Sequence, residues 1–226
     1  MSWLPKGECK STFVPIGANI PERLARRLSS EAVDEPKTVV VFGVTGPPGT
    51  RFEIEDIAYI MRNVDTAVEN VRLVVVGRGT AEVRESLTKA LGPTKVQLEV
   101  RGVLSAEEIA SQFQRARALL FTRGAISPQR GSAIAGIACG LPIVGYQNGD
   151  VSQPLKEAGI EWAPLGNREV MARNLIRVLT DNERWLELHE RNLQTQKDWF
   201  SWDRIAEQFC SVLDMESTGR VTRSER

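Results

Sequence analysis

The chain has 226 residues, and its content of 42% hydrophobic and 26% charged residues is that of an ordinary soluble globular protein. Lys plus Arg and Asp plus Glu each number 29, so the net charge is zero and gives no reason to expect a nucleic-acid or anionic-membrane partner. The length suits one large domain, with two small domains as the alternative.

Metal, disulfide and membrane sites are not expected either. The cysteines Cys9, Cys139 and Cys210 lie far apart and His189 is the only histidine, so the sequence predicts neither a zinc site nor a disulfide framework. No apolar run approaches the about 20 residues that span a bilayer, and the N-terminal residues lack the apolar core of a signal peptide. We therefore expect a cytoplasmic protein with no membrane span and no metal cofactor.

The two ends of the chain differ from its middle. Residues 1–36 combine an extended segment, broken by prolines and a glycine, with a linker-like stretch, so we expect a hinge or N-terminal extension there. Residues 37–214 are predicted to form one domain. Residues 215–226 are polar and without periodicity, which predicts a disordered tail.

From residue 38 onward, buried strands alternate with amphipathic helices. Continuous β-branched runs predict strands that are buried on both faces, and apolar residues at helical spacing predict the helices between them. Thr80 is expected to cap one helix, and Ser105 with Glu108 has the spacing of a capping box. The expected strands cover residues 38–43, 71–77, 95–100, 118–121, 143–146 and 160–164.

This alternation predicts βαβ units in an α/β fold. Right-handed crossovers then cover both faces of the sheet, giving a doubly wound, Rossmann-like parallel sheet. Ligands bind such sheets at the carboxyl ends of the strands. That rule selects the loops that follow residues 43, 77, 102, 122 and 146 as the place of the site.

The stretch from residue 117 to residue 146 contains the strongest candidate site. An apolar strand leads through a loop into a helix of small residues, and Arg130, Gly131 and Ser132 at its start offer a cation, backbone N–H groups and a hydroxyl. A helix N-terminus attracts anions because its unpaired N–H groups and its dipole point the same way. Two interpretations stay open: a phosphate of a nucleotide-type ligand binds here, or the small residues only allow tight packing on the sheet.

Glycine turns and arginines at other strand ends fit the same ligand. Gly43, Gly77 and Gly102 each end a predicted strand, and an arginine on a strand-end loop can meet a phosphate through two hydrogen bonds. Each such arginine can equally be a solvated surface charge. The arginines on strand-end loops are Arg51, Arg78, Arg123 and Arg130.

Other conspicuous residues are interpreted as structural. Residues 43–51 do not match a phosphate-binding P-loop, because the second glycine and the lysine that should follow it are missing. His189 lies in a segment rich in Glu and Arg and is predicted to be a surface histidine without a catalytic role. Trp185, Trp199 and Trp202 fall at helical spacings and are expected to be core or interface anchors.

Four stretches of the chain form a recognisable series: VRLVVVGRGT, VRGVLSAEEIASQFQRARALLFT, IAGIACGLPIVGYQNG and WFSWDRIAEQFCSVL. Together they resemble the C-terminal, nucleotide-sugar-binding domain of retaining GT-B glycosyltransferases of the sucrose synthase and glycogen synthase type. The resemblance covers residues 11–214, and its first residues are similar to the hinge that ends the N-terminal domain of that family. It implies one half of a GT-B fold without that N-terminal domain.

The resemblance also implies a function. The chain would bind a nucleotide-diphosphate sugar for retaining transfer to a glycan or lipid acceptor, without a metal, and arginines and helix N–H groups would neutralise the leaving diphosphate. No catalytic residue is assigned, because the family's two donor glutamates fall at Ser127 and Ala135. The residues expected around the donor are Gly43, Arg51, Gly77, Arg78, Gly102, Arg130, Gly131 and Ser132.

Other functions stay open beside this one. The chain could be a degenerate, non-catalytic binding module, or a split-enzyme half that works with a partner chain or a missing N-terminal domain. Such a partner would pack on the apolar face of the last helix, which includes residues 202–213. An epimerase of the same fold is a weaker alternative, since its catalytic carboxylates and histidines are not matched.

Overall fold

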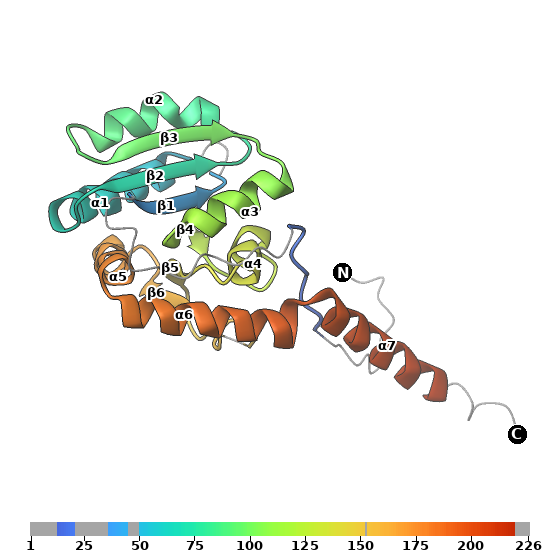
Figure 1. Cartoon of the computed structure of the whole chain (residues 1–226). Helices are drawn as coiled ribbons and strands as arrows, with labels where there is room; N and C mark the ends of the chain where they lie inside the picture. Colours follow the sequence, from blue (N-terminus) through green and yellow to red (C-terminus); the bar gives the residue numbers. More distant parts are fainter. Residues whose placement is uncertain (1–12, 21–35, 45–49, 152, 220–226) are drawn as a thin grey trace, which may run out of the picture.

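The computed structural model describes residues 13–20, 36–44, 50–151 and 153–219, which fold around one parallel sheet (Figure 1). The six strands lie in the order β3-β2-β1-β4-β5-β6, and every neighbouring pair runs parallel. The predicted doubly wound sheet is confirmed. The strands are β1 Lys37–Phe42, β2 Val71–Val76, β3 Gln97–Gly102, β4 Ala118–Ala125, β5 Ile143–Gln147 and β6 Ile160–Pro164.

Helices cover both faces of this sheet. One hydrophobic core joins one face to α1, α2 and α5, and a second core joins the other face to α3 and α4. Successive side chains of a strand point to opposite faces, so Val39 and Val41 of β1 enter the first core and Val40 enters the second. The helices are α1 Thr50–Ala67, α2 Thr80–Leu91, α3 Ala106–Arg115, α4 Gly131–Ala138, α5 Arg168–Thr180, α6 Asn182–Thr195 and α7 Trp202–Gly219, with a π-helical turn, η1 Gln196–Phe200, before α7.

The predicted capping box is present at the start of α3. The Ser105 hydroxyl accepts from the N–H of Glu108 at 3.2 Å, and the Glu108 carboxylate accepts from the N–H of Ser105 at 2.8 Å. The bond from the Ser105 N–H is the largest cause that lowers the pKa of Glu108 below its ordinary value, because it favours the charged carboxylate, and the Ser105 side chain lowers this pKa as well. The prediction for α2 is wrong: Gly79, with a φ of 76°, occupies the cap position, and Thr80 is the first helical residue.

Most of the two predicted end segments lies outside the described residues. Of the expected hinge or extension, only residues 13–20 and Pro36 lie within the described residues. Of the expected tail, residues 215–219 continue α7 to Gly219 and residues 220–226 lie outside the described part. The helix continues because no proline or glycine interrupts the sequence before Gly219.

At the amino ends of the strands, α6 supplies buried hydrogen bonds to the backbone. Asn192, which is fully buried, accepts from the Gly159 N–H at 2.7 Å and donates to the Leu141 carbonyl at 2.8 Å. One amide side chain thus satisfies backbone groups just before β5 and β6. The chain there has no room for a side chain at position 159, where a Cβ would lie 1.8 Å from the Leu188 carbonyl oxygen.

The prediction that His189 is a surface histidine is wrong. Its side chain is buried, its Nδ1 donates to the Gly140 carbonyl at 2.6 Å, and its ring stacks on Trp185 at 4.9 Å between centroids. The Glu- and Arg-rich neighbours of His189 occupy the solvent side of the same helix. His189 therefore holds α6 against the start of β5, at the end of the sheet opposite to the strand-end loops.

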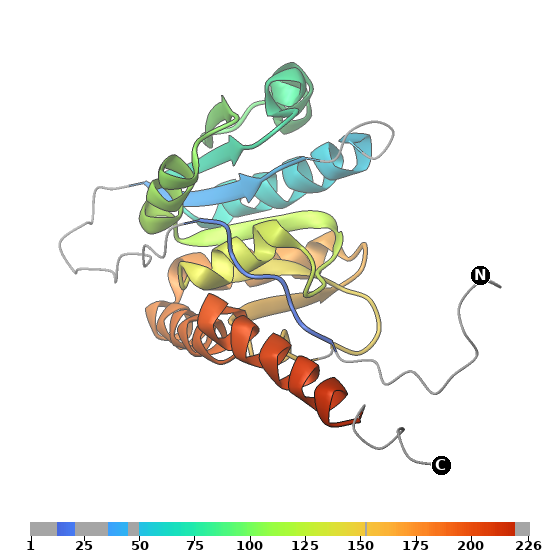
Figure 2. The ribbon, with the colours of Figure 1, turned by 90° about the vertical axis from the view of Figure 1, so that its right-hand side faces the viewer.

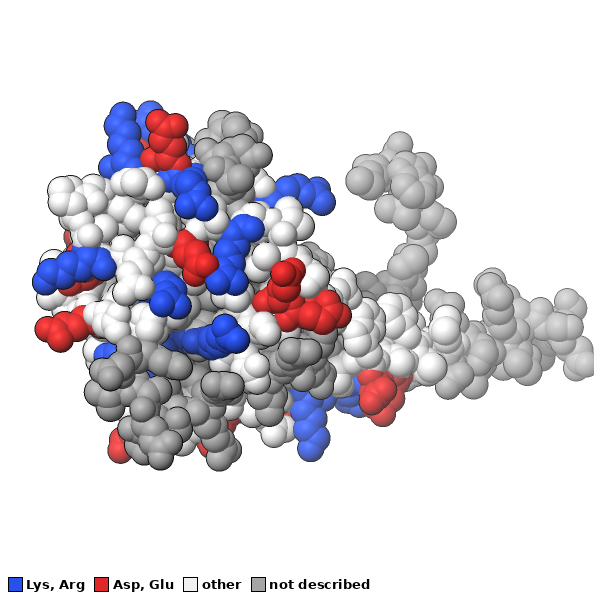
Figure 3. Space-filling model, turned by 45° about the horizontal axis from the view of Figure 1, so that its top comes forward, with Lys and Arg blue, Asp and Glu red and all other residues white. Residues whose placement is uncertain are grey.

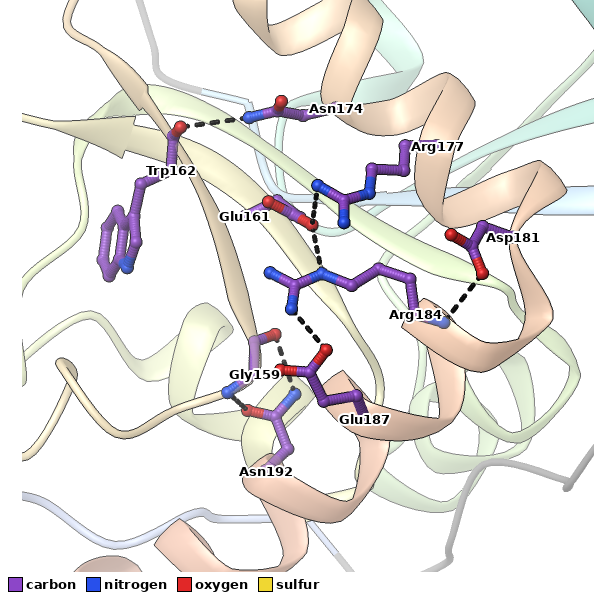
Figure 4. A network of polar contacts seen from close by, with 9 residues as sticks. All are labelled: Gly159, Glu161, Trp162, Asn174, Arg177, Asp181, Arg184, Glu187 and Asn192. Atoms are coloured by element: carbon purple, nitrogen blue, oxygen red, sulfur yellow. Dashed lines mark hydrogen bonds and ion pairs between the residues drawn. The ribbon is translucent and has the colours of Figure 1, made fainter.

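The edge strand β6 is held by a buried carboxylate (Figure 4). Glu161 accepts from Nε of Arg184 at 2.6 Å and lies 4.0 Å from Nη1 of Arg177, so α5 and α6 both contact it. Arg184 also pairs with Glu187 at 2.5 Å. Asn174 of α5 donates to the Trp162 carbonyl at 3.0 Å, which satisfies one outward-facing group of the edge strand.

The last helix, α7, projects from the body of the protein (Figures 1 and 2). Its first residue, Trp202, donates from Nε1 to the Ala18 carbonyl at 3.1 Å and packs so closely on Gly17 that a Cβ there would lie 2.8 Å from the indole. Phe209 and Leu213, farther along α7, are exposed. Trp202 is therefore an interface anchor between α7 and residues 13–20, in line with its prediction.

On the face seen in Figure 3, Lys and Arg alternate with Asp and Glu, and neither sign forms one large patch. Among the described residues, no helix is both long enough and apolar enough to cross a membrane.

Candidate functional site

The strand order reverses between β1 and β4, the two central strands. From β1 the chain winds outward through β2 and β3, and it then returns to β4 and winds the other way through β5 and β6. The loops after β1 and β4 consequently leave the sheet toward opposite faces, and ligands of doubly wound folds bind at this switch point. The β1–β4 ladder is short, with Val39 opposite Ala118 and Val40 opposite Leu119.

Three of the predicted glycines lie next to one another at this edge. The Gly43 N–H donates to the Val76 carbonyl at 2.7 Å, and the Gly77 N–H donates to the Gly102 carbonyl at 2.6 Å. A Cβ on Gly77 would lie 3.1 Å from the backbone of Gly43, and its φ of 113° is one that other residues rarely adopt. Glycine at position 77 therefore lets the ends of β1 and β2 approach each other.

The start of α4 presents hydrogen-bond donors without acceptors. The N–H groups of Ala133 and Ile134 both bond to the Arg130 carbonyl, at 2.9 and 3.1 Å. Within the part of the chain that the structure describes, the N–H groups of Gly131 and Ser132 have no acceptor. Because unpaired N–H groups at a helix start attract negative charge, the first turn of α4 is suited to an anion.

Arg123, near the end of β4, joins the two loops of the switch point. Its Nη2 donates to the Ser132 hydroxyl at 2.9 Å, and its Nη1 lies where it would be 3.1 Å from a Cβ on Gly43. The guanidinium also lies 5.7 Å from the centre of the Phe121 ring. One side chain thus reaches from β4 to both the end of β1 and the start of α4.

The charges around Arg123 oppose one another. Burial lowers the pKa of Arg123, the carboxylate of Glu53 on α1 raises it, and the charge of Arg130 lowers it. The Nε of Arg123 is buried and has no hydrogen-bond partner among the described residues. The guanidinium is therefore partly removed from water, and its buried Nε–H donor is unused.

Two predicted arginines do not join this group. Arg51 is 84% exposed at the start of α1 and pairs with Glu55 on its own helix at 2.9 Å, and Arg78 is exposed in the turn before α2. Arg123 carried the same sequence signal, an arginine on a strand-end loop, but was not among the residues assigned to the donor. This sequence pattern does not predict the direction in which an arginine side chain points, because that direction depends on where the strand ends.

The small residues of α4 also allow close packing, as the alternative interpretation expects. A Cβ on Gly136 would lie 2.8 Å from a methyl group of Leu119. The packing involves the middle of the helix, whereas the unused donors lie at its first turn. Both interpretations therefore describe the same helix at different positions.

The positions of the family's two glutamates lie beside this group. Ala135 is buried in α4, and Ser127 lines a small cavity of about 100 Å³ together with Gln147 and Asp150. A larger groove of about 740 Å³ runs along β6 and includes Trp162, but none of the predicted donor residues lines it. Gln147 and Asp150 line both the small cavity and the groove, so the groove adjoins the position of Ser127.

A family model described as "Glycosyl transferases group 1" matches residues 36–181, more than half of the chain. The chain belongs to the group 1 glycosyltransferases. This domain also matches solved structures, with between 13% and 19% sequence identity in the three given below, which shows a shared fold. No curated protein matches it by sequence at a significant level.

The first structure is a sucrose-phosphate synthase from Thermosynechococcus elongatus, 19% identical, with a TM-score of 0.68 over 96% of this chain and 55% of that one. The second is Anabaena HepE in complex with UDP and glucose, 15% identical, with a TM-score of 0.60 over 80% of this chain and 49% of that one. The third is the C-terminal domain of a group 1 family protein from Francisella tularensis, 13% identical, with a TM-score of 0.56 over 74% and 89% of the two chains.

These matches define which part of a glycosyltransferase the domain corresponds to. This group 1 glycosyltransferase domain spans about half the length of the sucrose-phosphate synthase and of a lipopolysaccharide galactosyltransferase that it also matches, at 55% of each. It covers most of the isolated C-terminal domain. The expected C-terminal-type half of a GT-B fold is therefore confirmed.

Proposed function

We propose that the chain binds a nucleotide-diphosphate sugar at the switch point and acts as the donor-binding half of a retaining glycosyltransferase of the sucrose synthase and glycogen synthase type. The acceptor would be a glycan or a lipid. One observation carries the proposal: the closely packed glycine ends of β1 and β2 lie at the same edge as the unpaired N–H groups of Gly131 and Ser132.

Each part of this arrangement has a use in binding a diphosphate. Glycines at strand ends let a phosphate approach the backbone, and the first turn of α4 offers N–H groups and the positive end of its dipole. HepE, which shares the fold, is described in complex with UDP and glucose. The proposed donor contacts remain Gly43, Arg51, Gly77, Arg78, Gly102, Arg130, Gly131 and Ser132.

The chain's share of the chemistry would be electrostatic. As the sugar leaves, charge builds on the diphosphate, and hydrogen-bond donors already in place stabilise it without reorganising. Ala135 can offer no hydrogen bond to a ribose, and Ser127 carries no charge, so we assign neither a catalytic role. We carry over the predictions that no metal cofactor is needed and that the protein is cytoplasmic.

A second candidate is a half enzyme or binding module that needs another domain. The observation that favours it is the exposed apolar surface of α7, where Trp202, Phe209 and Leu213 are 59%, 55% and 63% exposed. A first GT-B domain, in a partner chain or a longer polypeptide, would cover this surface. Burial of three large apolar side chains would then stabilise the pair.

Calorimetric titration of the full chain with UDP-, GDP- and ADP-glucose tests the donor site. The proposal expects binding of at least one of them, and the absence of heat with all three would contradict it. Hydrolysis of the bound donor by the chain alone would favour an enzyme. Binding without hydrolysis would favour the half enzyme or binding module.

A further inference from the structure

We infer that Arg123 is the cation that contacts the donor diphosphate, and that it orients the Ser132 hydroxyl toward the same phosphate group. This assignment adds a residue to the sequence-based donor set, whose arginines are Arg51, Arg78 and Arg130. It rests on the proposed donor site, because it names residues of that site.

The first argument is position. Arg123 is the described arginine that contacts both loops of the switch point: its Nη2 bonds to Ser132 at 2.9 Å and its Nη1 lies over Gly43. Arg51, by contrast, is 84% exposed and pairs with Glu55 on its own helix. A cation that contacts both loops is already in place before a ligand arrives.

The second argument is hydrogen-bond capacity. A guanidinium has five N–H donors, and among the described residues only one hydrogen bond of the Arg123 side chain, to Ser132, is present. The Ser132 oxygen accepts that bond, so the hydroxyl hydrogen can be donated elsewhere, and no described residue accepts it. Ser132 is only 8% exposed, so few water molecules can take this hydrogen.

The third argument is convergence. Several hydrogen-bond donors lie together here: the guanidinium of Arg123, the hydroxyl of Ser132 and the N–H groups of Gly131 and Ser132. Arg123 is hydrogen-bonded to Ser132, and Gly131 directly precedes Ser132 in the chain. A phosphate oxygen accepts several such bonds at once, and bonds to a charged acceptor are about twice as strong as neutral ones.

The fourth argument is charge. Burial has the largest effect on the pKa of Arg123 and lowers it, and the carboxylate of Glu53 raises this pKa by more than the charge of Arg130 lowers it. A bound phosphate would add negative charge beside Arg123 and would favour the charged guanidinium, which burial disfavours.

A purely structural role for Arg123, as a contact between β4 and α4, makes a different prediction. Loss of a structural contact would lower the stability of the ligand-free protein and would lower the affinity for every ligand to a similar degree. Loss of a phosphate contact would lower the affinity only for ligands that carry the phosphate. The two roles are therefore separated by a ligand series.

The experiment uses the full chain and the tightest binder among UDP, GDP and ADP, together with its parent nucleoside and inorganic pyrophosphate. We expect Arg123→Met to lower the affinity for the nucleoside diphosphate and for pyrophosphate by about 10- to 100-fold. The affinity for the nucleoside should fall by less than about twofold. Arg123→Lys, which keeps the charge but loses the planar fork, is expected to fall between. The control is Arg115→Met, which makes the same charge change at an exposed arginine, the last residue of α3.

The possible results are distinct. Equal weakening of nucleoside and diphosphate, or no weakening by Arg123→Met while wild type binds, would overturn the assignment and leave the donor site standing. Failure of the wild-type chain to bind any of the three diphosphates would remove the donor site and the assignment together. Thermal unfolding of both variants checks that they are folded. If Arg123→Met does not fold, the comparison of Arg123→Lys with the wild type still tests the assignment.

Discussion

Arg123 donates from Nη2 to the hydroxyl of Ser132 over 2.9 Å, and this bond joins the end of β4 to the first turn of α4. The two residues are separated by the loop that contains Ser127, one of the family's glutamate positions. The contact therefore fixes the geometry of the loop at the point where the winding of the sheet reverses. Changes to either residue should therefore alter anion binding more than folding.

A carboxylate at position 132 should act as a built-in competitor of the ligand. Ser132→Asp would place a negative charge beside Arg123 and the free N–H groups of α4, which favours the folded helix. We expect thermal stability to be kept or raised and nucleoside-diphosphate affinity to fall at least about tenfold, through repulsion. Ser132→Asn, neutral and of the same shape, is the matched control. Equal affinities of the two variants would contradict the anion site.

Gly43 should tolerate no side chain. Gly43→Ala forces a Cβ to within 3.1 Å of Nη1 of Arg123, at a φ of 81°. We expect the free energy of unfolding to fall by about 1–2 kcal/mol from backbone strain, and the nucleoside-diphosphate affinity to fall as well. Gly79→Ala has a similar φ of 76° with open space around it, so it should lose stability alone. Urea unfolding measures the stability, and calorimetry measures the affinity. An unchanged affinity in Gly43→Ala would contradict the prediction.

Asn192 should be important for stability and irrelevant to the ligand. Asn192→Ala leaves the Gly159 N–H and the Leu141 carbonyl buried without this partner, and each such group costs about 1–3 kcal/mol. We expect unfolding to become easier by about 2–4 kcal/mol with unchanged nucleotide affinity. Asn174→Ala, which removes one bond to the edge strand, should cost about 1 kcal/mol or less. Denaturant titration separates the two, and similar losses would show that the Asn192 contacts are less important than proposed.

The capping box of α3 should make stability depend on pH. The pKa of Glu108 is lower in the folded protein, so its contribution is present above its ordinary value, about 4.3, and is lost as the pH falls through the lowered value. Glu108→Gln keeps an acceptor for the Ser105 N–H but does not titrate. The stability difference between wild type and Glu108→Gln should therefore be larger near pH 7 than near about pH 3. An equal difference at both pH values would argue against the charge.

The fold could be predicted from the sequence because its signals are local. Runs such as VVVF in β1 and VRLVVV in β2 are buried on both faces, and the capping box of α3 sets its start by contacts three residues apart. The β4 strand was the exception, since it continues past Phe121 to Ala125. That extension, set by pairing with β5, was not visible in the apolar run.

The parts that could not be predicted depend on contacts between distant residues. His189 has charged sequence neighbours, but α6 crosses the amino ends of the strands and buries it between Trp185 and Gly140. Arg51 and Arg123 carry the same sequence signal, yet one faces solvent on α1 and the other reaches Ser132. Only the arrangement of strands and helices decides which arginine lies at the switch point.

The central claim is that a nucleotide-diphosphate sugar binds where β1 and β2 end and α4 begins. Its most direct test is a titration of the ¹⁵N-labelled full chain with UDP-, GDP- and ADP-glucose, followed by backbone amide chemical shifts. We predict the largest shift changes at the amides of Gly43, Gly77, Gly131 and Ser132. Changes confined to the groove along β6 or to α7, or no changes with any of the three donors, would contradict the claim.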